Sequence, residues 1–517
     1  MSIELPPPPQ PRLGSVETLQ PQAGVGVAVA FQTYQIHVSA TGVLDEAGIR
    51  NAIGVATDLS GAVRNIGAAA YLAGYPAAQV TYALSGQNLF VLVTPGKISG
   101  IRAPEPLQPY LNGLQHADPL TASALEGHRT LASMAADRAG VTIYPVFEPD
   151  GSGGQVLDFE KNNKETDPTT VKGELSNVGN RYASRYFLDL DLKTASAWGD
   201  EFHAFWRHGL SQLDNKGQDG DFNEQDLAWN RVTPYGVFGA GGRYVNYFYH
   251  AAGIPLDGRI DSGELSWLYP LYADFTRRLT FQSKVDRIDK RASLQDTVGT
   301  FPAGTTLNRQ LYTSGELGLS YAQNFELIAH RWSFEGGVSL RKGFGSDERN
   351  NPQVLANQGY LLYRPAMRLK FYWNNQIDSG IEGSGQLSNN TLPEEQQWVL
   401  GGVGNLTSVL PGVSLGDKGY LARAFTEVAG PTVLGIALTP KIFVEQGGAR
   451  YARPTTLNGQ TVGTQKLVDV GAELGFKFAR FIDGSFAYAH LISDQNISHA
   501  TEDTARAQLY FRIAAKF

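Results

Sequence analysis

The chain ends in Ala505-Arg-Ala-Gln-Leu-Tyr-Phe-Arg-Ile-Ala-Ala-Lys-Phe517, a stretch in which apolar and polar side chains alternate. Successive side chains of a β-strand point to opposite faces, so this stretch predicts a strand with one apolar face and one face that carries two cations. Such a strand of about ten residues is typical of a transmembrane β-barrel, with lipid outside and water inside. The apolar face, which we interpret as the signal that closes the barrel, includes Leu509, Phe511, Ile513 and Phe517.

The same alternation returns upstream in many segments. Val470, Leu474 and Phe478 share one parity, while Asp469 and Glu473 lie on the other. These charged faces do not suit a dry core, whereas a water-filled lumen accommodates them. Strand-like segments follow one another at intervals of roughly twenty residues, and the stretch Gly239-Ala240-Gly241-Gly242 predicts a tight turn between two of them. The fold class is therefore an all-β transmembrane barrel of about 16 antiparallel strands over residues 165–517.

Composition excludes several classes of function. The 517 residues have a net charge of −7, which gives no support for nucleic-acid binding, and contain no cysteine, which excludes disulfides and thiolate metal sites. The nine histidines are scattered. No nucleotide-binding or hydrolase motif occurs, so we expect no enzyme activity, no metal and no cofactor. The start, Met1 to Pro9, has no cationic segment followed by an apolar core, so we expect the numbering of a mature chain.

The chain before the barrel predicts two small domains. Prolines 6–9 and Pro11 predict an extended leader over residues 1–30. Residues 31–96 then predict strand, helix, helix, strand and strand, and residues 97–164 repeat this order. The order resembles the POTRA domain, a periplasmic module that precedes some outer-membrane barrels; a generic pair of α+β domains is the alternative. We predict that the strand with Val80, Tyr82 and Leu84 is an exposed sheet edge that binds an extended polypeptide.

A long segment interrupts the strand rhythm at about residues 384–419. Loops of this length are usually functional or disordered. Within it, Leu400-Gly401-Gly402 and Gly416-Asp417-Lys418-Gly419-Tyr420 resemble the sixth extracellular loop of two-partner secretion transporters, the TpsB family, which includes haemolysin secretion and activation proteins. A later strand, Phe443-Val444-Glu445-Gln446-Gly447, resembles the family's Phe-x-Asp-x-Gly motif with glutamate in place of aspartate.

The resemblance implies a location, partners and a mechanism. In this family the loop folds back into the lumen, the barrel lies in the bacterial outer membrane and the POTRA domains lie in the periplasm. The implied partners are a secreted TpsA-like exoprotein, outer-membrane lipid and the barrel assembly machinery, and we expect a monomer. This sequence departs from the family in one respect, because no arginine follows Leu-Gly-Gly in the loop. Either neutral hydrogen bonds hold the loop, or Lys418 or Arg423 supplies the positive charge to Glu445.

Three functions fit these patterns. The first is an outer-membrane transporter that recognises a large adhesin, haemolysin or toxin and secretes it through the barrel without ATP. The second is an assembly factor of the BamA type, which shares the barrel and the folded-in loop. The third is a passive porin with periplasmic domains, which the folded-in loop disfavours. Binding of a defined secretion domain would distinguish the first function from the other two.

Overall fold

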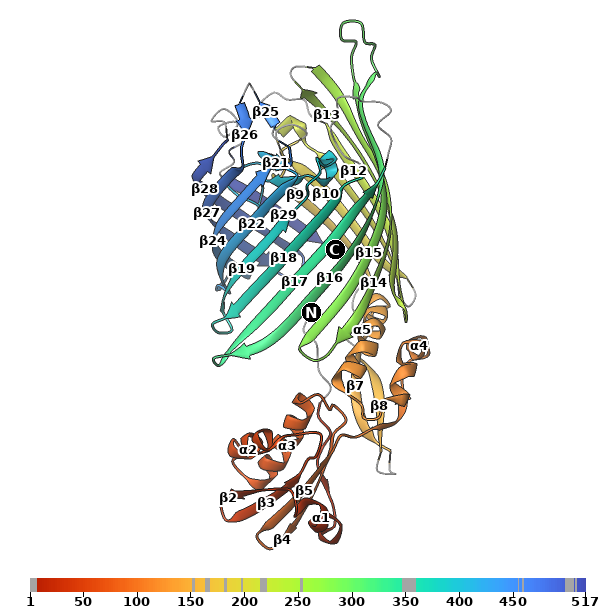
Figure 1. Cartoon of the computed structure of the whole chain (residues 1–517), viewed down its shortest axis with the longest axis vertical. Helices are drawn as coiled ribbons and strands as arrows, with labels where there is room; N and C mark the ends of the chain where they lie inside the picture. Colours follow the sequence, from red (N-terminus) through yellow and green to blue (C-terminus); the bar gives the residue numbers. More distant parts are fainter. Residues whose placement is uncertain are drawn as a thin grey trace.

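The computed structural model describes residues 7–150, 154–162, 168–180, 184–196, 199–213, 221–251, 254–345, 359–453, 455–457, 460–497, 506 and 509–517. Figure 1 shows two small α+β domains, in red and orange, at one end of a large barrel. No helix in the described part of the chain is long and apolar enough to cross a membrane.

The first domain is a five-stranded sheet with helices on both faces. Its sheet order is β1-β4-β5-β3-β2, and α2 and α3 pack against one face while α1 packs against the other. Ser15, Asp45 and Asp58 each accept a backbone N–H at the start of a helix, which explains where these helices begin. The elements are β1 (Arg12–Leu13), α1 (Val16–Ala23), β2 (Val27–Phe31), β3 (Tyr34–Ser39), α2 (Glu46–Gly54), α3 (Leu59–Leu72), β4 (Gln79–Ser85) and β5 (Asn88–Thr94).

The predicted leader over residues 1–30 is wrong for most of its length. Residues 12–30 contribute β1, α1 and most of β2 to the first domain. Helix α1 buries Leu19 and Ala23 against Ala83 and Phe90 of the sheet, so these residues belong to the domain core. The prediction failed because a proline, Pro21, lies inside α1 and because two-residue strands such as β1 carry no periodic signal.

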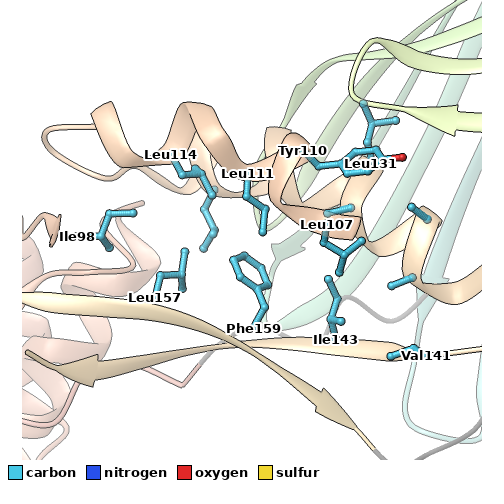
Figure 2. Close-up of a cluster of buried hydrophobic side chains, with 14 of the residues drawn as sticks. Ile98, Leu107, Tyr110, Leu111, Leu114, Leu131, Val141, Ile143, Leu157 and Phe159 are labelled. Atoms are coloured by element: carbon cyan, nitrogen blue, oxygen red, sulfur yellow. The ribbon is translucent and has the colours of Figure 1, made fainter. Parts of the chain in front are cut away.

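The second domain repeats the architecture with a smaller sheet of order β6-β8-β7. Figure 2 shows its core, in which Leu111 and Leu114 of the helical layer lie over Leu157 and Phe159 of the sheet. The predicted order of strand, helix, helix, strand and strand is found here. The elements are β6 (Ile98–Arg102), η1 (Glu105–Leu107), α4 (Gln108–Leu111), η2 (Asn112–His116), α5 (Ala122–Arg138), β7 (Thr142–Pro149) and β8 (Gln155–Asn162).

The second domain is docked directly onto the end of the barrel. The Tyr110 hydroxyl donates to the Val232 carbonyl at 2.8 Å, and Arg138 Nη1 donates to the carbonyls of Gly199 and Asn230 at 2.8 and 3.2 Å. Val232 belongs to the same buried cluster as the core of the second domain. The barrel and this domain therefore share a core, which fixes the orientation of the domain beneath the lumen.

The first domain also reaches the barrel. The ring of Tyr71 in α3 stacks on Phe275, in the turn between β14 and β15, with ring centroids 4.8 Å apart. Beside this stack, Glu126 and Arg129 of α5 form a buried ion pair at 2.9 Å. Burial raises the pKa of the Glu126 carboxyl, and the adjacent Arg129 opposes that rise. Residues of both domains and of the barrel thus meet at one junction.

The barrel is closed and antiparallel, and its 16 strands confirm the predicted fold class. Side chains alternate between a charged lumen and an apolar outer wall, as a bilayer-spanning barrel requires. β23 (Thr432–Val433) continues β22 beyond a break, and β25 (Thr455–Leu457) pairs with β26 (Gln460–Val462) in a separate hairpin. The strands are β9 (Thr169–Ser176), β10 (Phe187–Ser196), β11 (Asp200–Gly209), β12 (Phe222–Thr233), β13 (Gly236–Ala251), β14 (Ile254–Ala273), β15 (Arg277–Leu294), β16 (Thr306–Leu327), β17 (His330–Phe344), β18 (Leu361–Tyr372), β19 (Ile377–Gln386), β22 (Lys418–Val428), β24 (Ile436–Arg450), β27 (Gln465–Phe478), β28 (Ile482–Gln495) and β29 (Leu509–Lys516).

The barrel closes where β29, the last strand, pairs with β9, the first. Phe517 and Val171 exchange backbone hydrogen bonds of 2.8 and 3.2 Å at one end of this seam. At the other end the Asn177 side chain accepts from Phe511 N at 2.6 Å and donates to the Leu509 carbonyl at 3.0 Å. An amide side chain therefore completes the seam where the short strands end.

The predicted turn at residues 239–242 is wrong, because these residues lie inside β13. A side chain at Gly239 would meet the Ser266 hydroxyl at 2.5 Å, so the close neighbouring strand explains why glycine occurs there. The actual turn lies between Thr233 and Gly236.

The docking contacts predict the effect of Arg138→Ala. The substitution removes two hydrogen bonds from a charged donor, each of about 1.5–3 kcal/mol, so we expect the second domain to detach at a lower temperature than in the wild type. Differential scanning calorimetry of the full chain will show this as a lowered first transition. Arg50→Ala is the matched control because Arg50 pairs with Glu46 on the surface of α2 and, among the described residues, forms no ion pair with the barrel. Equal shifts in the two variants would contradict this account of docking.

Candidate functional site: a loop held inside the barrel

The segment between β19 and β22, residues 387–417, lies largely inside the barrel and is called the lumen loop here. It contains η4 (Glu394–Gln396), β20 (Trp398–Leu400) and β21 (Ser414–Gly416). Leu400, Leu406 and Val409 of the loop are completely buried, packed against Leu467 and Leu491 of the barrel wall. The predicted folded-in loop is therefore present, and an apolar contact holds part of it against β27 and β28.

Two buried carboxylates of the wall hold the loop tip. Thr407 N donates to Glu445 Oε2 and Ser408 N donates to Asp469 Oδ2, both at 2.7 Å. Glu445 in β24 and Asp469 in β27 are cross-strand partners, and neither is exposed. Two adjacent buried carboxylates repel each other and lose hydration, so both depend on these donors. The loop tip and the carboxylates thus stabilise each other.

Arg423 in β22 supplies the positive charge that the loop itself lacks. Its Nε lies 3.2 Å from Glu445 Oε1, and its guanidinium lies 4.5 Å from the centre of the Phe443 ring. Two ways to hold the loop without its own arginine were predicted, namely neutral hydrogen bonds and a cation from elsewhere in the chain. The structure contains both. Lys418 plays no part at this position, because its Nζ donates to Asn389 Oδ1 at 2.8 Å.

The glycines of the loop motif make the close approach possible. Gly401 and Gly402 have φ angles of +108° and +101°, which other residues rarely adopt. A Cβ at Gly401 would lie 2.1 Å from the Leu410 carbonyl oxygen, and one at Gly447 would lie about 3 Å from the side chains of Leu400 and Leu406. The loop tip therefore brings together six of the predicted site residues: Leu400, Gly401, Gly402, Phe443, Glu445 and Gly447.

The base of the loop is fixed by Asp417, a fully buried residue. Its carboxylate accepts from Leu392 N at 2.7 Å and from Ala452 N at 2.8 Å, which ties the start of the loop to the end of β24. Gly416 and Gly419 flank it and allow close contact with Arg450 and Trp398. Tyr420 lies apart from this group, because its ring covers Gly448 on the outer side of the wall.

A second anchor on the opposite wall was not predicted. Lys290 Nζ in β15 contacts Glu394 at 2.8 Å and Glu395 at 3.0 Å, and Gln396 donates to the Tyr312 hydroxyl at 3.2 Å. The loop therefore spans the lumen from β24 and β27 to β15 and β16. The sequence shows two neighbouring glutamates, but only the closed barrel brings Lys290 close to them.

The C-terminal strand also contacts the loop. The Tyr510 hydroxyl donates to the Val409 carbonyl at 2.8 Å, and Tyr510 is almost fully buried. Its inward parity was visible in the sequence, whereas its contact with the loop was not. The predicted closing residues of the other parity point outward, and Leu509, Ile513 and Phe517 are 53%, 39% and 75% exposed.

The predicted polypeptide-binding edge of the first domain is wrong. β4 is covered by β1, since Arg12 pairs with Thr81 and Leu13 pairs with Tyr82. Val80 faces the helices and is buried, whereas Leu84 is exposed at the end of the strand. The prediction failed because β1 belongs to the segment interpreted as a leader. At the opposite side of the sheet, β2 has no further strand beside it among the described residues.

Among the residues that the structure describes, no group of three or more histidine, aspartate or glutamate side chains could hold a metal ion.

The two wall carboxylates predict the behaviour of Glu445→Gln. Loss of the charge weakens the hydrogen bond from Thr407 N and the ion pair with Arg423. We therefore expect the population of molecules with a displaced loop to rise roughly tenfold, which corresponds to a change of about 1.4 kcal/mol in the free energy of displacement. Because the chain has no cysteine, a single Ser408→Cys probe will report displacement as a faster reaction with a thiol reagent. Glu427→Gln is the control, since Glu427 contacts Lys441 and not the loop. An unchanged rate in Glu445→Gln would exclude the carboxylate as an anchor.

Solved structures with the same overall fold cover nearly the whole chain. CdiB from Escherichia coli has a TM-score of 0.67 at 13% identity and covers 96% of this chain and 92% of its own. CdiB from Acinetobacter baumannii has a TM-score of 0.62 at 12% identity, with 97% and 96% covered. BamA from Haemophilus ducreyi lacking POTRA domains 1–3 has a TM-score of 0.50 at 14% identity, with 95% and 100% covered.

At the level of sequence, no family model and no curated protein matches. The likeness therefore concerns the fold: a closed 16-strand barrel preceded by α+β domains of the POTRA type. The chain has the POTRA-plus-barrel fold that its resemblance to the two-partner secretion transporters predicted.

Proposed function

We propose that this chain is an outer-membrane transporter that recognises a large secreted exoprotein and passes it, unfolded, through the barrel without ATP. The observation that carries the proposal is the lumen loop, which spans a charged lumen and is held there by polar contacts with both walls and by an apolar cluster against one of them. A transporter needs a lumen that is closed at rest and opens when cargo arrives.

The first step of the proposed function is capture of an extended segment of cargo at β2. The two-residue hairpin pairs Phe31 with Tyr34, so Val27 and Val29 exchange hydrogen bonds with β3. In an antiparallel ladder the intervening residues, Ala28 and Ala30, direct their N–H and C=O groups away from the partner strand. An extended polypeptide can pair with these groups with little demand on its own sequence.

The other three sheet edges of the two domains are less suited to this role. β1, the edge strand beside β4, is only two residues long, and β6 has a register shift between Ile98 and Gly100. β7 contains Pro145 and Pro149, which lack an N–H group. β2 has neither proline nor charge over Val25 to Phe31. It is the edge on which strand addition meets the fewest obstacles.

The second step is passage through the barrel. The short turns between strands and the two small domains lie at the same end of the barrel. Cargo bound to the first domain is therefore delivered to this end. Displacement of the lumen loop exposes a hydrated wall of alternating charges to which an unfolded chain adheres weakly. Folding of the cargo outside the cell then prevents its return, so no nucleotide is required.

Location and further partners follow from the same proposal. The barrel lies in the bacterial outer membrane as a monomer, with the two small domains in the periplasm. Its C-terminal strand, with Leu509, Phe511, Ile513 and Phe517, is the segment that the barrel assembly machinery reads during insertion. An assembly factor of the BamA type is the alternative function, and the TM-score of 0.50 with BamA is the observation in its favour.

Binding of cargo tests the proposal. The purified full chain is titrated with the amino-terminal domain of a large secreted protein encoded beside it, and we expect saturable binding. A fragment used for the same purpose must include residues from Pro7 onward, so that β1 still covers β4. Absence of binding together with intact channel conductance would favour the assembly factor or a passive pore.

The open edge predicts a specific variant. Ala28→Pro removes an outward N–H without removing a bond between β2 and β3, so we expect binding to weaken roughly five- to tenfold, as for one lost hydrogen bond. Ala28→Val is the control, because valine keeps the N–H and favours a strand. Equal affinities of the two variants would place the cargo elsewhere on the protein.

A further inference from the structure

The outer wall of the barrel changes character abruptly along β14, β15 and β16. On β14, outward side chains are apolar from Tyr269 to Gly263 and charged at Asp261 and Arg259. On β15, the apolar series ends at Val285. The charged residues beyond this boundary, called the arginine cluster here, are Arg259, Asp261, Arg287, Asp289, Arg291 and Arg309.

The arginine cluster faces away from the lumen. Lys290 points into the lumen, where it contacts the loop, and Ile288 is buried in a luminal core cluster with Val245 and Tyr312. Side chains alternate along a strand, so Arg287, Asp289 and Arg291 lie on the opposite, outer side. The cluster is therefore separate from the transport path.

Within the cluster the carboxylates lie beneath the guanidinium groups. Asp289 accepts from Arg309 at 2.8 and 3.0 Å and from Arg291 Nε at 3.2 Å, and its side chain is only 14% exposed. The side chains of Arg291 and Arg309 are 41% and 34% exposed. Arg259 binds Asp261 at 2.7 and 3.0 Å and lies 5.0 Å from the ring centre of Tyr244.

The cluster carries an excess of positive charge. Four arginines against two aspartates give a net charge of +2, and the arginines form the outer layer. Arg287 is exposed and makes no ion pair with any other described residue. The guanidinium fork matches the oxygens of phosphate, so the surface is suited to bind a phosphorylated group.

A hollow of about 850 Å³ connects the cluster to the apolar belt. Arg287 and Arg309, together with Asp261 and Asp289, line its charged part, and Trp206, Leu227 and Leu311 line its apolar part. A lipid has the same division between a phosphorylated headgroup and acyl chains. Free phosphate would leave the apolar half of the hollow empty.

We propose that the arginine cluster binds the phosphate groups of an anionic lipid of the outer leaflet. The headgroup lies against Arg287 and Arg309, and the first part of an acyl chain lies against Trp206 and Leu227. Arginines on a lipid-facing wall are least unfavourable near the membrane interface, where they can meet headgroup phosphates. The proposal depends on the membrane location proposed above and is independent of any cargo.

Lipid titration of the full chain in detergent, followed by native mass spectrometry, tests the proposal. The probe is a diphosphorylated glycolipid, lipid A, compared with the same lipid after removal of its phosphates and with inorganic phosphate. We expect the doubly substituted Arg287→Gln/Arg309→Gln chain to bind lipid A at least about tenfold more weakly. Arg480→Gln, at an exposed periplasmic turn, is the matched control and should bind as the wild type does.

Two further measurements keep the test decisive. Arg287→Gln alone breaks no ion pair among the described residues, so its weaker binding of lipid A cannot be attributed to a disturbed fold. Equal affinity of wild type and both variants would overturn the proposal, as would equal binding of the dephosphorylated lipid. Competition by inorganic phosphate at the same concentration as lipid A would identify a general anion site instead. Cargo binding, measured on the same samples, reports separately on the proposed transport function.

Discussion

The structure depends on the pairing of backbone polar groups within a bilayer. A strand in hydrocarbon has no water for its N–H and C=O groups, so the sheet must close on itself. Closure requires β29 to meet β9, and both strands are only eight residues long. Asn177 completes the hydrogen bonds beyond the paired residues, and the terminal Phe517 pairs with Val171 at the other end. Along all the other strands, side chains can then alternate between the lipid-facing side and the water-filled lumen.

Closure also creates the problem that the lumen loop addresses. Inward charges sit in a confined space, and Glu445 and Asp469 are adjacent and fully buried. Two backbone amides and Arg423 compensate these carboxylates, while Lys290 compensates Glu394 and Glu395 on the other side. The loop therefore belongs to the electrostatic balance of the wall. The buried apolar cluster of Leu400, Leu406 and Val409 adds to these polar contacts on the side of β27 and β28.

The small domains and the outer wall are the parts of the chain that lie outside the lumen. The core that the second domain shares with Val232 of the barrel holds this domain beneath the lumen. The contact of Tyr71 with Phe275 attaches the first domain to the same end of the barrel. On the outer wall the boundary between Val285 and Arg287 separates an apolar belt from a cationic layer. The edge proposed for cargo, the cluster proposed for lipid and the lumen thus lie on separate parts of the molecule.

The sequence by itself determined the class of fold, the repeated domain order and the loop motif, because each depends on local alternation, on turn residues or on a short run of glycines. Parity placed Asp469 and Tyr510 on the inner face of the barrel, and the resemblance of its strand motif implied the same for Glu445. Tertiary structure decided which of these residues meet, since Lys290 and Glu395 or Tyr510 and Val409 lie about a hundred residues apart and approach only when the barrel closes. It also decided that β1 covers β4 and leaves β2 open, because a two-residue strand has no period to detect and gains its partner only through the folded sheet.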